Sequence, residues 1–125
     1  MKNNPYQQYK QTQINTASPG ELVLMLYNGA IKNLNQSINF LEQDNKEEFR
    51  LKIEKTQDIV VELTSTLKQD EEISKNFASL YQFVINRLIK AHASLSKEPV
   101  EEALKILTDM RDTWKEMLTK LNEEK

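Results

Sequence analysis

The sequence predicts an all-α protein, an antiparallel up-down bundle of four helices with a flexible N-terminal arm or a short extra helix. Glycine and proline are scarce, with two and three residues among 125, which leaves little room for hairpins or irregular loops. Four long segments carry apolar residues at steps of three and four, the period of a packed helix. Short turns join these segments, and helices joined in this way pack as antiparallel neighbours.

One bundle over residues 18–122 is expected, with residues 1–17 as the arm. We expect its helices over residues 19–42, 46–67, 72–95 and 99–121. No segment alternates between apolar and polar residues as a strand does. The arm is rich in Gln and Asn and carries Tyr6, Tyr9 and Ile14.

The first helix has a strong start signal. Ser18 is placed as the N-cap, with its hydroxyl accepting a hydrogen bond from the backbone N–H of Glu21. Glu21 can reach back to the N–H of Ser18, which would complete a capping box. Pro19 falls at the first helical position, where its missing N–H is no loss.

Each predicted helix has one apolar stripe that should face the common core, and burial of each stripe residue contributes about 1.5–3 kcal/mol. These stripes are Val23, Leu26 or Tyr27, Ala30, Leu34, Ile38 or Ser37, and Leu41; Phe49, Ile53, Thr56, Val60, Leu63 and Leu67; Ile73, Phe77, Leu80, Val84, Leu88, Ala91 and Leu95; and Val100, Ala103, Leu107, Met110, Trp114, Met117 and Leu121.

Many apolar residues remain outside these stripes. Wide stripes could absorb some of them, since helices of globular proteins bury more than two positions per heptad. Val61 and Phe83 lie far from their stripe centres, however, and a second apolar surface is a candidate for binding a partner helix or a wrapped peptide. The predicted partner-binding residues are Leu22, Met25, Val61 and Phe83 on the helices, together with Tyr6, Tyr9 and Ile14 of the arm, which could fold back over the exposed groove when no partner is present.

Residues 16–30 read Thr-Ala-Ser-Pro-Gly-Glu-Leu, then an apolar run, then Leu-Tyr-Asn-Gly-Ala. This segment resembles the flagellin-specific export chaperones, the FliS family. The paired tyrosines Tyr6 and Tyr9 match the Tyr-rich arm of that family. Further matches occur at Asn76, Leu80-Tyr81, Arg87-Leu88 and Leu107-x-x-Met110-Arg111-Asp112-Thr113-Trp114, whereas Asn28 stands where the family often has Asp.

The resemblance implies a cytoplasmic chaperone that binds the disordered C-terminal segment of flagellin, prevents its premature polymerisation and helps deliver it to the type III export apparatus. Components of the flagellar export gate would be further partners. The resemblance also implies that the arm covers part of the flagellin-binding surface. An exposed groove could additionally pair two copies in a weak homodimer.

Charge and hydrophobicity argue against several other classes of protein. The net charge is −2, with 17 basic and 19 acidic residues, which argues against binding to nucleic acid or to an anionic membrane surface. The longest apolar run, Leu22 to Tyr27, is far too short to span a membrane, and no secretory signal is visible, so a cytoplasmic location is expected.

No catalytic residue, metal ligand or cofactor is predicted, and the protein is expected not to be an enzyme. There is no cysteine, and His92 is the only histidine, with Ile89 where a Glu-x-x-His metal motif would need Glu. The competing interpretation is a structural or adaptor bundle that self-associates or binds another partner helix through its second apolar surface. A metal-dependent bundle enzyme is much less favoured, because its ligands are missing.

Overall fold

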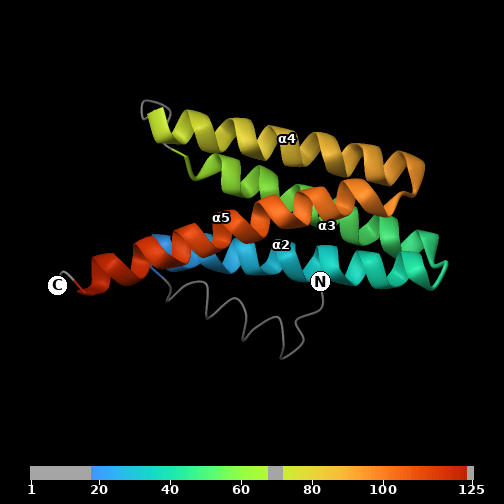
Figure 1. The fold of residues 1–125 in the computed structure, drawn as a ribbon, viewed down its shortest axis with the longest axis horizontal. Coiled ribbons are helices and arrows are strands. Elements are labelled where there is room, and N and C mark those ends of the chain that lie inside the picture. The colour runs from blue at the N-terminus through green and yellow to red at the C-terminus, as the bar shows by residue number, and fades with distance from the viewer. Residues whose placement is uncertain (1–17, 68–71, 124–125) are drawn as a thin grey trace, which may run out of the picture.

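A computed structural model describes residues 18–67 and 72–123 of the chain. Their regular structure consists of four helices: α2 (Pro19–Glu42), α3 (Lys46–Ser65), α4 (Glu72–Ser94) and α5 (Lys97–Glu123). Figure 1 shows them packed side by side. The predicted all-α four-helix bundle is thus confirmed in this part of the chain, while the predicted arm lies outside it.

The helices form a closed ring in which α2 contacts α3 and α5, and α4 contacts the same two helices. Three hydrogen bonds between α2 and α5 show that these helices are antiparallel. Residue numbers along α2 rise from one bond to the next, while those along α5 fall. Trp114 bonds to Gly20, Arg111 to Asn28, and Lys97 to Glu42. One end of the bundle therefore gathers the start of α2, the end of α3, the start of α4 and the end of α5 (Figure 1).

The start of α2 follows the predicted capping chemistry in part. The Ser18 hydroxyl accepts a 3.2 Å hydrogen bond from the backbone N–H of Glu21, and Pro19 is the first helical residue. The Glu21 carboxylate accepts a second bond from the Ser18 hydroxyl, where the prediction had it accept from the Ser18 backbone. The helix start is nevertheless fixed by the three predicted residues.

Four helix ends differ from the predicted ranges, by one residue at the end of α4 (Ser94) and by two residues at the other three, including the end of α5 at Glu123. Helix α3 ends at Ser65, two residues early, and Thr66 closes it by donating its hydroxyl to the Leu63 carbonyl. Helix α5 begins at Lys97, two residues before Pro99. Pro99 is tolerated there because N–H groups in the first helical turn have no intrahelical acceptor.

The core contains most of the predicted stripes, and the structure decides between the alternatives left open in α2. Tyr27 and Ser37 are fully buried, whereas Leu26 and Ile38 are only partly buried. Ser37 satisfies its hydroxyl within the helix by donating to the Leu34 carbonyl. The core is the set Val23, Tyr27, Ala30, Leu34, Phe49, Ile53, Val60, Leu63, Tyr81, Val84, Leu88, Ala91, Val100, Ala103, Leu107 and Met110.

Three stripe predictions were wrong. Leu80 is 38 % exposed, and Tyr81 takes the buried position in its place. Both residues fit the helical spacing, but the Tyr81 hydroxyl finds a buried partner, which removes the cost of burying it. Met117 and Leu121 are also exposed, because the last turns of α5 lie at the open end of the bundle.

Candidate functional site

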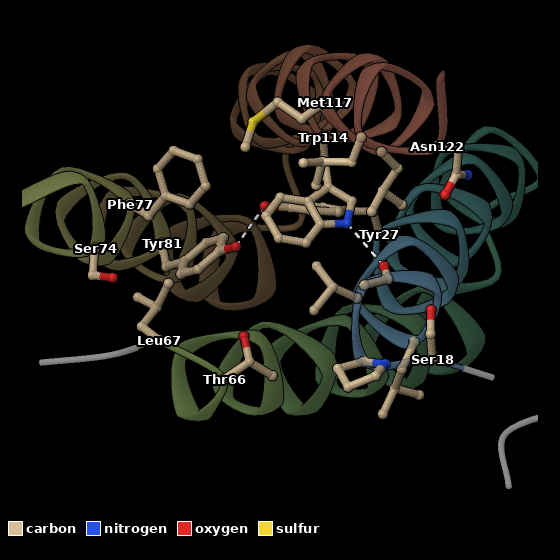
Figure 2. A pocket seen from close by; sticks show the side chains of 16 residues that line it. Ser18, Tyr27, Thr66, Leu67, Ser74, Phe77, Tyr81, Trp114, Met117 and Asn122 are labelled. Carbon is tan, nitrogen blue, oxygen red and sulfur yellow. Dashed lines mark hydrogen bonds between the residues drawn. The ribbon is translucent and has the colours of Figure 1, made fainter. Parts of the chain in front are cut away.

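The described helices enclose a pocket of about 670 Å³ at the end of the bundle where α2 begins and α5 ends. All four helices or their ends contribute to it, and its walls are mainly apolar (Figure 2). The lining residues are Ser18, Pro19, Gly20, Leu22, Val23, Tyr27, Thr66, Leu67, Ser74, Phe77, Tyr81, Trp114, Met117, Leu118, Leu121 and Asn122. We refer to this site as the end pocket.

A pair of tyrosines from α2 and α4 forms the inner part of the end pocket. The hydroxyls of Tyr27 and Tyr81 share a hydrogen bond, drawn as a dashed line in Figure 2, and their ring centroids are 6.4 Å apart. Phe77 contacts Tyr81 edge-on from one turn earlier in α4. The two phenols thus place a polar group within an aromatic and aliphatic wall.

Burial keeps both phenols protonated. Desolvation raises the pKa of Tyr27 above its ordinary value of 10.0, and the bond from Tyr81 opposes that rise only in part. Desolvation also raises the pKa of Tyr81, and there the hydrogen bond to Tyr27 adds to the rise. Both side chains are therefore neutral donors and acceptors across the physiological pH range.

Another wall of the end pocket depends on a close approach between α2 and α5. The Trp114 indole N–H donates a 2.9 Å hydrogen bond to the Gly20 carbonyl. A Cβ atom added at Gly20 would lie 2.7 Å from Cδ2 of Leu118, so the absence of a side chain allows this approach. Gly29 is different, because its added Cβ would make only an ordinary 3.6 Å contact with Ile59.

The predicted partner-binding residues that the structure describes do not lie together in one place. Leu22 lines the end pocket, and Met25 is half-buried one turn further along α2. Val61 and Phe83 are 62 % and 43 % exposed and lie outside the end pocket. Tyr6, Tyr9 and Ile14 lie outside the described residues.

Polar side chains elsewhere join neighbouring helices. The His92 imidazole lies 2.8 Å from a Glu54 carboxylate oxygen, and Arg50 donates to the His92 carbonyl, which links α3 to α4. Arg87 lies over the Phe83 ring, 5.4 Å from its centroid, and pairs with Glu102 of α5 at 3.7 Å. Within residues 18–67 and 72–123, no group of three His, Cys, Asp or Glu side chains is placed to hold a metal ion.

The sequence prediction missed Gly20, Tyr81 and Thr66 as pocket residues. Tyr81 could have been found, because the spacing of Phe77, Tyr81, Val84 and Leu88 is as regular as the one chosen with Leu80. Gly20 gave no comparable signal, since glycine after proline at a helix start is read first as part of a turn. Its role depends on Leu118, which is far away in the sequence.

Comparison with known proteins decides the family. A family described as "Flagellar protein FliS" matches residues 2–121. The chain belongs to the FliS family. The flagellar secretion chaperone FliS of Bacillus subtilis is 36 % identical over 115 residues, which cover 92 % of this chain and 86 % of that protein. The flagellar secretion chaperone FliS of Vibrio cholerae is 29 % identical over 105 residues, which cover 82 % of this chain and 77 % of that protein.

The FliS-family fold is also found in a solved structure described as a flagellar chaperone from bacteria. The two structures superimpose with a TM-score of 0.76, and their sequences are 19 % identical. The superposition covers 92 % of this chain and 95 % of the solved chain. The predicted resemblance is confirmed, and the protein is a member of a family of flagellar secretion chaperones. None of the described helices is long and apolar enough to cross a membrane.

Proposed function

We propose that this protein binds the disordered C-terminal segment of flagellin, keeps it from polymerising early and helps deliver it to the flagellar type III export apparatus. Membership of the FliS family supports this function, because its members are secretion chaperones. The observation that carries the proposal is the end pocket. It is a large apolar cavity that opens where four helix ends meet, and apolar cavities of this size accept protein side chains.

The end pocket suits a chain segment better than a compact folded surface. Leu121 and Met117 remain exposed beside it, so the apolar surface continues along the last turns of α5. A segment that inserts one or two large side chains could extend along this surface as a helix. A disordered client would lose conformational entropy when it orders there, and the buried apolar area would have to offset that loss.

Further contacts are proposed outside the end pocket. An extended client that wraps the bundle would bury an area above about 2,000 Å², more than a pocket of this size supplies. Met25, Val61 and Phe83 are proposed as contacts of the continuing segment. Phe83 offers an exposed aromatic ring with Arg87 beside it, a pairing common in protein interfaces.

The arm is proposed as a cover for the same site in the free protein. Residues 1–17 join the bundle at Ser18, and Ser18 itself lies on the rim of the end pocket. Tyr6, Tyr9 and Ile14 supply the apolar side chains that a cover would need. A client would then compete with the arm, and release at the export gate would be aided by the return of the arm.

Binding of the flagellin C-terminal segment tests this function directly. We expect calorimetry to show one-to-one binding and circular dichroism of the mixture to show helix beyond the sum of the parts. Absence of binding at tens of micromolar would contradict the proposal. It would favour an adaptor bundle that uses its exposed apolar residues to self-associate, which sedimentation of the free protein would reveal.

A further inference from the structure

The tyrosine pair in the end pocket has more hydrogen-bond donors than partners. Each hydroxyl carries one proton, and the single bond between Tyr27 and Tyr81 uses only one of the two. Among residues 18–67 and 72–123, neither hydroxyl has a second hydrogen-bond partner. One O–H donor of this pair, which lines the end pocket, is therefore left without an acceptor from the described helices.

Two neighbouring donors of the end pocket already have acceptors within the bundle. The Trp114 indole N–H is used by the Gly20 carbonyl, and the Thr66 hydroxyl is used by the Leu63 carbonyl. Phe77 packs edge-on against Tyr81, and Val23 and Leu67 also line the end pocket; none of these three side chains offers an acceptor. Burial also keeps the phenols in their protonated form, so the donor persists across physiological pH.

We infer that the Tyr27–Tyr81 pair is a specificity determinant of the end pocket, selecting a client segment that brings a carbonyl oxygen together with its apolar side chains. This inference rests on the proposed binding of a flagellin segment. The carbonyl could belong to the client backbone or to an Asn or Gln side chain, and its chemistry is the same in both cases. It would accept the free O–H and complete a chain of two hydrogen bonds.

The end pocket would disfavour a client segment that inserts only hydrocarbon side chains, because such a segment offers no acceptor to the tyrosine O–H. Whatever meets the free proton in the unbound protein, a client that enters the end pocket displaces it. Displacing a hydrogen-bonding group by one that cannot reproduce its bonds lowers affinity. An unmade bond at a buried donor is costly, whereas an apolar client with a carbonyl at the right place avoids that cost.

Substitution of both tyrosines by phenylalanine tests the inference, because it removes the hydroxyls and keeps the rings. The probe is the flagellin C-terminal segment, measured by calorimetry against the wild-type protein and against Tyr27→Phe with Tyr81→Phe. We expect the double variant to bind about tenfold more weakly or worse, since the carbonyl of the bound segment would lose its donor. Tyr81→Phe alone should lie between, because Tyr27 keeps a donor.

Thr56→Val is the matched control. The Thr56 hydroxyl is also buried in the bundle, but it donates to the Lys52 carbonyl and lies outside the end pocket. This variant should bind within twofold of the wild type, and melting curves should show that all variants remain folded. If the double phenylalanine variant is folded and binds within twofold of the wild type, the inference is wrong while the proposed function stands. If the wild-type protein does not bind the segment, both fall together.

Discussion

The indole N–H of Trp114 donates a 2.9 Å hydrogen bond to the backbone carbonyl of Gly20, which ties the last turns of α5 to the first turn of α2. Leu118 packs onto the space left by the missing side chain of Gly20. Two elements from opposite ends of the chain thus build one wall of the end pocket (Figure 2). The shape of the pocket depends on how closely these two helices approach.

Gly20→Ala tests this close approach, with Gly29→Ala as the matched control. Alanine at Gly29 should stabilise the protein by about 0.5–1 kcal/mol, because the new methyl has room and alanine favours the helix. Alanine at Gly20 must displace Leu118, so we expect its helix gain to be cancelled or reversed. Urea unfolding measures both. Equal stabilisation by the two substitutions would contradict the role assigned to Gly20.

The two tyrosines predict a pH dependence of stability. Both have a folded-state pKa above 10.0, so the folded protein holds protons that the unfolded chain releases near pH 10. Their stabilising contribution should be fully present below pH 10 and decline above it, by up to about 1.4 kcal/mol per pH unit for each tyrosine.

Unfolding by urea between pH 9 and pH 11 measures this slope. The protein with Tyr27→Phe and Tyr81→Phe should show a shallower decline, because lysine titration affects both proteins alike. Identical slopes for the two proteins would show that burial does not hold these protons.

A charge at the rim of the end pocket should weaken client binding. Leu121 is 55 % exposed and lines the pocket, so Leu121→Glu should be folded but should place a carboxylate where the client buries apolar surface. We expect calorimetry to show at least about tenfold weaker binding of the flagellin segment.

Leu51→Glu is the control for this substitution. Leu51 is 41 % exposed and lies near the start of α3, away from the end pocket. The Leu51→Glu variant should bind the segment with an affinity within twofold of that of the wild type. Equal loss in both variants would mean that the client contacts the bundle broadly and that the pocket has no special weight.

If the arm covers the end pocket, removing its tyrosines should expose apolar surface in the free protein. Tyr6→Ala with Tyr9→Ala should increase the fluorescence of a dye that binds exposed apolar surface, because the end pocket would lose its proposed cover. Gln7→Ala with Gln8→Ala changes the neighbouring positions and should leave the signal as it is. Unchanged dye binding by the tyrosine variant would show that the arm is not a cover.

The sequence predicted the helices well because their periodicity is local information. Phe49, Ile53, Val60 and Leu63 follow one stripe, and all four are fully buried. The choice between Leu80 and Tyr81 could not be made locally, since it depends on the hydroxyl of Tyr27 in another helix.

The end pocket was harder to predict than the fold. The sequence pointed to Leu22 and to a second apolar surface, but not to a cavity. The cavity depends on Gly20 and Leu118, which meet only when α2 and α5 pack, and on Met117 and Leu121, which the periodic pattern assigned to the core. A stripe of constant period gives no sign of where the bundle opens at its end.

Trp114 is the only tryptophan of the chain and lines the end pocket, so it provides the most direct test of where the client binds. The protein would be labelled with 5-fluorotryptophan and titrated with the flagellin C-terminal segment while its fluorine NMR signal is recorded. If the segment binds in the end pocket, the single resonance should shift and should saturate at one equivalent of segment. An unchanged resonance, in a sample where calorimetry shows binding, would contradict the end pocket as the client site.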